Sequence, residues 1–148
     1  MGREEQIINE RLRKIRELRA QGINPYPNKF EVKNNSSDLQ EKYKKLKNEQ
    51  KTKDKAKIAG RLMTIRDLGK IAFASMQDGH GKIQITLQEK ETPEKIREFF
   101  KKYIDSGDFI GVEGTIFRTK SGELSVMVKS LEILSKSILP LPEKWHGL

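Results

Sequence analysis

The sequence predicts a mainly β (α+β) fold: a small closed barrel of five strands, with one helix between the third and fourth strands and a basic helical extension before the first. Three observations predict this fold. Apolar and polar residues alternate in five short stretches after residue 57, turn residues separate these stretches, and one amphipathic stretch of helical period interrupts them. With 148 residues, the chain is expected to hold an extension and linker over 1–56, one barrel over 57–135 and a terminal linker over 136–148.

The first two strands are predicted within Lys57–Asp78, where a turn at Asp67–Gly69 joins them. Because side chains alternate between the two faces of a strand, the second strand directs its small and flexible apolar residues to the core: Ala72, Ala74 and Met76. Phe73 then lies on the opposite face, unless the strand register is slipped and its ring joins the core. An aromatic ring outside a small basic β-domain is a surface on which a nucleobase stacks.

Three further strands are predicted at 82–88, 109–118 and 123–128, each from alternating apolar residues. A helix between the third and fourth strands is predicted to have Thr92 as N-cap and to end at Gly107. This order of elements is the layout of an OB-fold barrel, and the exposed face over strands two and three of that fold binds oligonucleotides.

The extension is predicted to contain two helices. Residues 3–20 have a narrow apolar stripe between basic faces, so this helix either docks through its stripe or contacts an RNA backbone through its cations. A second, short helix is expected to start at Ser37, because Ser37 and Gln40 have capping-box spacing. Residues 47–56 have no apolar period and indicate a solvated linker.

The charge balance favours a polyanionic partner. Lys and Arg number 30 against 21 Asp and Glu, which gives a formal net charge of +9. The most basic part is 41–57, where a lysine run serves either as a solubilising surface or as a contact to the RNA backbone. The residues predicted for backbone contact are Lys42, Lys44, Lys45, Lys47 and Arg61.

The same composition excludes several classes of function. No stretch approaches the roughly 18 apolar residues of a membrane span, and the absence of cysteine excludes disulfides and thiolate metal sites. We therefore expect no membrane partner and a cytoplasmic location. The two histidines, His80 and His146, lie in turn or tail contexts without the spacing of a metal site or a nucleophile–base pair. No catalytic residue, metal or cofactor is predicted in this chain.

One set of polar residues converges on Phe73. Gln84 of the third strand points to the same outer side, Arg66 lies at the end of the first strand, and Glu123 at the start of the fifth strand is expected to close the barrel next to the first. Together they offer a stacking plane, an amide, a guanidinium and a carboxylate, which suit a flipped-out pyrimidine. Taken singly, Arg66, Gln84 and Glu123 have ordinary interpretations as a surface ion pair, a surface amide and a turn residue.

At these positions the sequence resembles the N-terminal anticodon-binding domain of class IIb lysyl-tRNA synthetases. The resemblance covers nearly the whole chain in order and includes Ala59-Gly60-Arg61, Arg66, Gly69-Lys70, Phe73, Gln77-Asp78, Gln84, Gly107-Asp108, Gly111-Val112, Gly114, Thr119-Lys120, Gly122-Glu123-Leu124-Ser125 and Leu139-Pro140-Leu141-Pro142. Glu143-Lys144-Trp145-His146-Gly147-Leu148 resembles the linker by which that family enters its catalytic domain. We therefore expect residues 136–148 to lead toward a catalytic domain that this chain lacks.

The resemblance implies a role for each member of the set. Phe73 would stack on the central uridine of the lysine anticodon, Arg66 and Gln84 would hydrogen-bond that base, and Glu123 would help to read the anticodon. The implied partner is the anticodon stem-loop of tRNA(Lys). The parent protein would be a homodimeric lysine–tRNA ligase that uses ATP and Mg, whereas this fragment would only bind RNA.

Three alternatives remain open at this point. The aspartyl and asparaginyl synthetases share the barrel and much of the base-reading set. A stand-alone OB-fold module would bind single-stranded RNA or tRNA with little preference for sequence. A protein-interaction platform would use Phe73 and the first helix to pack against another subunit.

Overall fold

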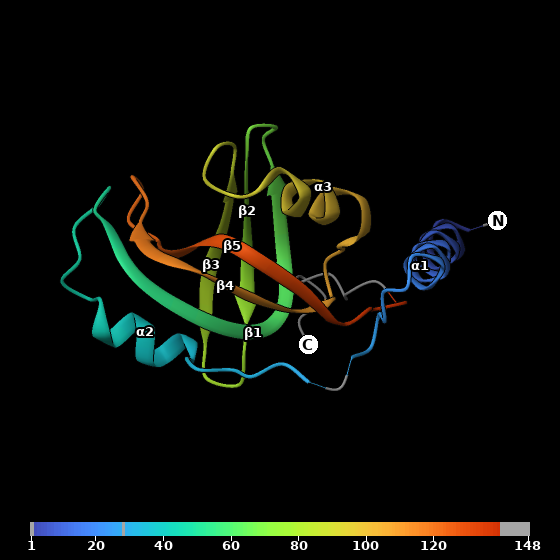
Figure 1. The fold of residues 1–148 in the computed structure, drawn as a ribbon, viewed down its shortest axis with the longest axis horizontal. Coiled ribbons are helices and arrows are strands. Elements are labelled where there is room, and N and C mark those ends of the chain that lie inside the picture. Colours follow the sequence, from blue (N-terminus) through green and yellow to red (C-terminus); the bar gives the residue numbers. More distant parts are fainter. Residues whose placement is uncertain (1, 28, 140–148) are drawn as a thin grey trace.

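A computed structural model describes residues 2–27 and 29–139, and the expectations for 140–148, including Trp145, lie outside these residues. Its five strands form one closed barrel in the order β1-β2-β3-β5-β4 (Figure 1). The elements in chain order are α1 (Arg3–Ala20), α2 (Ser36–Lys42), β1 (Lys51–Asp67), β2 (Ile71–Gln77), β3 (Lys82–Gln88), α3 (Glu94–Tyr103), β4 (Phe109–Arg118) and β5 (Leu124–Ser135). The predicted fold class, an OB-fold barrel with a helix between strands three and four, is confirmed.

The barrel closes along a short parallel ladder between β3 and β5, while its other strand pairs are antiparallel. The ladder pairs Gln84 with Ser125, Ile85 with Val126, and Thr86 with Met127. The hydroxyls of Thr86 and Ser125 lie 2.7 Å apart in a buried hydrogen bond that supplements the ladder. The expected closure of strand five against strand one was wrong, because the long β1 pairs with β4 over its first half and with β2 over its second half.

Strand β1 begins at Lys51, so the prediction of a solvated linker over 47–56 was wrong for its second half. Backbone pairing with β4 forms this part of the strand without an apolar repeat, since Lys55 pairs with Thr115 and Ala56 with Gly114. Ala56 is buried, and the Thr52 hydroxyl donates to the carbonyl of Ile116 at 2.7 Å. The barrel therefore starts before residue 57, the boundary expected from the sequence.

The interior of the barrel holds the residues that alternation predicted. Ala72, Ala74 and Met76 of β2 are buried, as are Ile83, Ile85 and Leu87 of β3 and Ile110, Val112, Ile116, Leu124, Val126 and Val128 of β4 and β5. Helix α3 packs against this core through Phe100. The predicted N-cap of α3 was wrong: Pro93 is the capping residue, and the Thr92 hydroxyl instead accepts from the Gln88 N–H at 3.1 Å.

Helix α2 begins at Ser36, and its N-cap is Asn35 instead of the predicted Ser37. The Asn35 side chain accepts from the N–H of Asp38 at 2.8 Å. The carboxylate of Asp78, in the turn after β2, accepts from the N–H and hydroxyl of Ser36 at 2.8 and 2.7 Å. The Asp78 carboxylate and the Asn35 cap thus fix the start of this short helix. The local spacing of Ser37 and Gln40 therefore did not predict the first residue correctly.

Replacement of Asp78 by Asn is expected to lower stability by about 1–3 kcal/mol near pH 7, because charged hydrogen bonds are lost. Burial would raise the pKa of Asp78, but hydrogen bonds from Ser36, His80 and Gly81 lower it overall. A lowered carboxyl pKa stabilises the fold above the unfolded-state pKa of about 3.9 and loses this effect as the pH falls through the folded-state value. Urea denaturation from pH 7 to pH 3 measures the free energy of unfolding of both proteins. The difference between the variant and wild type should become smaller below about pH 4. Glu98→Gln is the control, and a difference that stays constant over this range would contradict the prediction.

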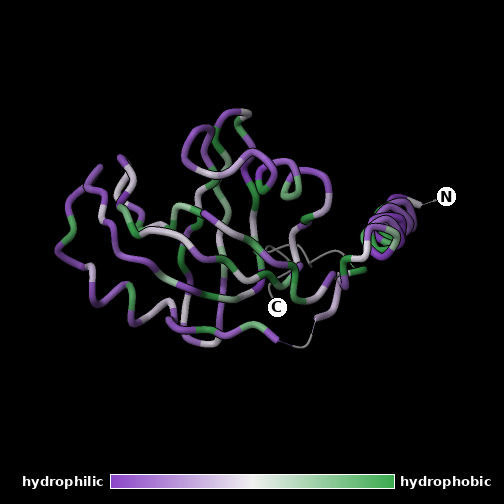
Figure 2. Tube along the Cα trace, viewed as in Figure 1, coloured by the Kyte–Doolittle hydropathy of each residue, from purple (hydrophilic) through white to green (hydrophobic). Residues whose placement is uncertain are grey.

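Helix α1 docks on the loop after α3 and on Leu139, as one of the two interpretations predicted; Figure 2 shows that it is otherwise hydrophilic. Its buried side combines Ile15 and Leu18 with Arg11, which donates to the carbonyls of Leu139 at 2.7 Å and Ser106 at 3.2 Å. Lys14 pairs with Asp105 at 2.8 Å. Two of the cations that could have faced RNA therefore hold the helix on the protein.

A buried ion cluster lies beneath this contact. Lys136 is fully buried, and its Nζ lies 2.5 Å from Asp105 and 2.6 Å from Asp108. Burial would raise the pKa of Asp105, but Lys136 and Lys14 lower it overall. Lys136, the first residue of the predicted terminal linker, is thus a fixed part of the barrel.

Candidate nucleic-acid interface

Phe73 lies on the outer side of the barrel, where it is half-buried between buried Ala72 and Ala74. It pairs across the sheet with Arg66 of β1 and Thr86 of β3. The Arg66 guanidinium lies 5.9 Å from the centre of the Phe73 ring, within the range of a cation–π contact. The strand register is therefore the one that the alternation predicted, and one face of the ring lies near a guanidinium.

Three of the four predicted base-reading residues line one pocket of about 470 Å³: Arg66, Gln84 and Glu123. Its other lining residues are Ser75, Lys82, Ile83 and Ser121. Phe73 lies two residues from Ser75 on β2 and contacts Arg66. The structure thus brings the four residues together from β1, β2, β3 and the turn before β5.

The turn that carries Glu123 is built from local hydrogen bonds. The Thr119 N–H donates to the carbonyl of Glu123 at 2.9 Å, and the Thr119 hydroxyl accepts from the Glu123 N–H at 3.0 Å. Gly122 adopts a φ of +97°, in the left-handed region that a residue with a Cβ rarely adopts. This conformation lets the chain turn from β4 into β5 and places Glu123 at the pocket edge.

The pocket combines both kinds of hydrogen-bonding group. Arg66 and Lys82 donate only, Glu123 accepts only, and the Gln84 amide does both. The donor and acceptor edge of a pyrimidine needs such a mixture, and the two cations also favour a phosphate nearby. The arrangement can therefore bind a nucleotide through its base and through its backbone.

Sequence reasoning missed Lys82, Ser75 and Ser121 as lining residues. Two of these had a signal in the sequence: Lys82 shares the outer face of β3 with Gln84, and Ser75 pairs directly with Gln84 across the sheet. Ser121 had no such signal, because its position depends on how the turn at 119–123 folds back.

The predicted backbone-contact residues are spread over two areas. Lys42, Lys44, Lys45 and Lys47 lie on α2 and the turn after it and are exposed; Lys44 is paired with Glu41, and the Lys42 ammonium lies 5.3 Å from the centre of the Tyr43 ring. Arg61 lines a separate pocket of about 340 Å³, where its guanidinium lies 4.9 Å from the centre of the Phe109 ring. The structure therefore groups the four lysines and leaves Arg61 apart from them.

Comparison with known proteins identifies the fold family. Residues 56–134 match the family described as OB-fold nucleic acid binding domain. The chain belongs to this OB-fold family. The barrel and its outer pocket are thus the parts of a nucleic-acid-binding domain, although the role of each pocket residue stays a prediction.

Relatives of this OB-fold domain are similar over nearly its whole length. The chain is 41% identical over 146 residues to the lysine–tRNA ligase of Thermosipho africanus, covering 97% of the chain and 28% of the ligase. It is 43% identical over 140 residues to the lysine–tRNA ligase of Thermotoga maritima, covering 94% and 28%. With the chloroplastic/mitochondrial lysine–tRNA ligase of Arabidopsis thaliana, the identity is 43% over 147 residues, covering 97% and 24%. The chain thus spans about a quarter of the length of these relatives.

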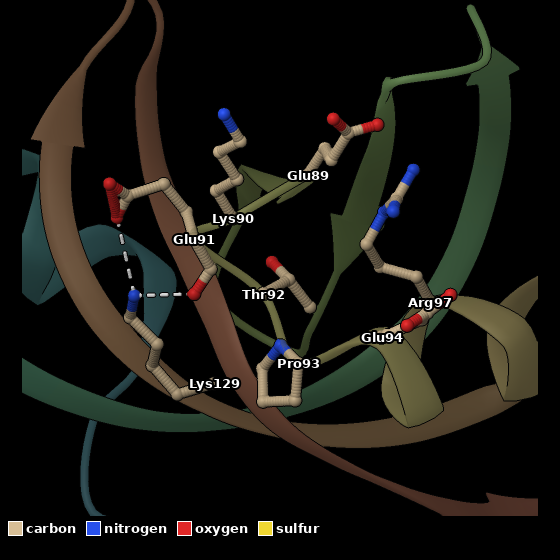
Figure 3. A pocket seen from close by; sticks show the side chains of 8 residues that line it. All are labelled: Glu89, Lys90, Glu91, Thr92, Pro93, Glu94, Arg97 and Lys129. Atoms are coloured by element: carbon tan, nitrogen blue, oxygen red, sulfur yellow. Dashed lines mark hydrogen bonds and ion pairs between the residues drawn. The ribbon is translucent and has the colours of Figure 1, made fainter.

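A larger hollow of the OB-fold domain, about 580 Å³, lies between the 89–93 loop, α3 and β5 (Figure 3). Its lining contains three glutamates and three cations, so it offers no net positive charge. Lys129 donates to the carbonyl of Glu91 at 2.6 Å and pairs with its carboxylate at 3.4 Å. This balance of charge makes it a weaker candidate for a polyanion than the pocket beside Phe73.

Two further findings concern metal ions and membrane-spanning helices. In the part of the chain that the structure describes, no group of three or more His, Asp and Glu side chains could hold a metal ion. None of the helices at 2–27 and 29–139 is both long and apolar enough to cross a membrane.

Proposed function

We propose that this OB-fold domain recognises the anticodon stem-loop of tRNA(Lys). The observation that supports it most directly is the grouping of Arg66, Gln84 and Glu123 around one outer pocket beside Phe73. The similarity to lysine–tRNA ligases supports the choice of tRNA.

The central uridine of the anticodon is proposed to stack on Phe73. The uracil edge carries two carbonyl acceptors around one N–H donor, so it needs donors on both sides of an acceptor. Arg66 and the Gln84 amide supply donors, and the Gln84 oxygen accepts. Glu123 is proposed to read the anticodon from the β5 side of the same pocket. A cytosine would present an amino donor in place of one carbonyl and an N3 acceptor in place of the N–H donor, so the same arrangement of Arg66 and Gln84 would face like groups.

Replacement of Phe73 by Ala tests this proposal. Stacking of a base on an aromatic side chain contributes about 1–3 kcal/mol, so affinity for the lysine anticodon stem-loop should fall about 5- to 150-fold. Phe109→Ala is the matched control, because Phe109 is an exposed aromatic that lines a different pocket. Fluorescence anisotropy titration measures both affinities, and an unchanged affinity of Phe73→Ala would contradict the proposal.

A general single-strand binder is the second candidate, and it is supported by the description of the matched family, which specifies nucleic acid and no sequence. The two functions differ in how they respond to the central anticodon base. Stem-loops in which only that uridine is changed should bind more weakly under the first proposal and equally well under the second.

The properties of a longer parent protein are also proposals. We propose a lysine–tRNA ligase that uses ATP and Mg, forms a homodimer and acts in the cytoplasm. The relatives are named as such ligases, and the chain spans 28% of the length of the first of them. The functions proposed for this chain itself are limited to RNA binding.

A further inference from the structure

Arg118 joins three segments of backbone at the end of β4. Its Nε donates to the carbonyl of Leu46 at 2.7 Å, its Nη1 to that of Gly122 at 2.8 Å, and its Nη2 to that of Tyr43 at 2.8 Å. The residue is half-buried, and no salt bridge to it is found within the described residues. Each nitrogen of the guanidinium therefore makes one bond to a main-chain oxygen.

These bonds tie the turn that carries Glu123 to the lysine-bearing segment at 40–48. Asn48 strengthens the same junction, because its amide donates to the carbonyl of Lys120 at 3.2 Å. The backbone of Glu49 pairs with that of Arg118 at 2.9 Å. The turn and the segment are thus cross-linked at several points.

The lysine-bearing segment also contacts the β3 side of the pocket. The Gln40 amide donates to the carbonyl of Lys82, a lining residue at the start of β3, at 3.2 Å. Segment 40–48 therefore contacts both Lys82 and the 119–123 turn. The ladder between β3 and β5 sets where the turn ends, and this segment supports the turn through the residue that holds the two together.

We propose that Arg118 is a positioning residue of the anticodon site. This inference rests on the proposed function. Arg118 holds the 119–123 turn against segment 40–48 so that Glu123 stays in the pocket lining with Gln84 and Lys82. Lys42, Lys44, Lys45 and Lys47 on the same segment then keep a fixed place relative to the base that is read.

An arginine is needed because the three acceptors lie in different directions. The planar guanidinium presents donors in a rigid fork, whereas a lysine ammonium is a compact charge on a flexible stem. A lysine at 118 would keep the charge and lose most of the three bonds. The local hydrogen bonds of Thr119 and the conformation of Gly122 would still fold the turn, so its internal shape would survive and its placement would not.

The test compares Arg118→Lys with Glu123→Gln in the full chain. Each variant is titrated with the lysine anticodon stem-loop and with stem-loops changed at one anticodon base. Discrimination is the ratio of the affinity for the lysine stem-loop to the affinity for a stem-loop changed at one base. At the base where Glu123→Gln lowers this ratio, Arg118→Lys should also lower it, by about fivefold or more. The double variant should lower the ratio no further than the stronger single variant does. Arg97→Lys is the control, because Arg97 also donates to one carbonyl, that of Gly69, and neither residue lines the pocket.

A purely structural role would produce a different result. Arg118→Lys would then weaken all stem-loops equally, or its effect would add to that of Glu123→Gln, and either outcome would overturn the inference. Asn48→Ala provides a second variant at an exposed residue in case Arg118→Lys does not fold, and a smaller loss of discrimination at the same base is expected. If the wild type itself does not discriminate among the stem-loops, the proposed function fails, which is distinct from a failure at Arg118.

Discussion

The variant Lys136→Met is expected to lose about 3–5 kcal/mol of folding free energy, because removal of one partner leaves buried charge uncompensated. Lys136 is fully buried and contacts two carboxylates, of which that of Asp108 is itself fully buried. Asp108 also accepts from the N–H groups of Asp105 and Ser137, while burial raises the pKa of its carboxyl, so Lys136 is the charge that compensates it. Methionine fills a similar volume but supplies no donor.

Urea denaturation followed by circular dichroism measures this loss. Lys129→Met is the matched control, because the ion pair of Lys129 with Glu91 is largely exposed and should contribute about 0–1 kcal/mol. If the two variants lose the same small amount of stability, the cluster around Lys136 does not hold the barrel as we expect. Because Lys14 of α1 pairs with Asp105, the Lys136→Met variant should also weaken the docking of α1.

Replacement of Gly114 by Ala is expected to cost about 3 kcal/mol, at the upper end of the range for overpacking. A Cβ at this position would lie 1.9 Å from the carbonyl oxygen of Met127 and 2.7 Å from its carbonyl carbon. The clashing atoms belong to the backbone of the neighbouring strand, so a side-chain rotation cannot relieve the contact. Strand β4 would have to move away from β5 along a register that already shifts between Glu113 and Gly114.

Thermal denaturation tests this second expectation. Gly79→Ala is the control, since a Cβ at Gly79 would meet nothing within 4 Å. Equal melting temperatures for the two variants would show that β4 and β5 can separate at little cost. A displaced β4 would also move Arg118, so binding of the stem-loop should weaken together with stability.

The elements with an apolar repeat could be predicted from the sequence. Alternation in β2 and β3 was sufficient to place Met76 and Ile85 inside and Phe73 outside, because a strand offers only two faces. The start of β1 at Lys51 could not be found in this way, since its pairing with β4 is formed by backbone groups that every sequence has. The residues around Lys136 did not indicate that it is buried either. Its burial depends on the carboxylates of Asp105 and Asp108, about thirty residues away in the sequence.

The candidate site was predictable where it follows from strand geometry. Arg66, Phe73 and Gln84 share one face of three neighbouring strands, so two-residue periodicity and the order of the strands suffice to group them. Glu123 lines the same pocket as Gln84, but the sequence reasoning expected it beside β1, whereas β5 lies beside β3. Arg118 was not found, since its role depends on backbone carbonyls that carry no sequence signature.

The short parallel ladder between β3 and β5 has a further consequence for the pocket. Only three residue pairs form this seam, and parallel pairing is slightly weaker per residue than antiparallel pairing. Gln84 lies on one side of the seam, and Glu123 directly precedes the strand on the other. A nucleotide that contacts both residues would therefore bridge the shortest strand pairing of the barrel. Binding of the nucleotide would then stabilise the closed barrel, and the closed barrel would favour binding.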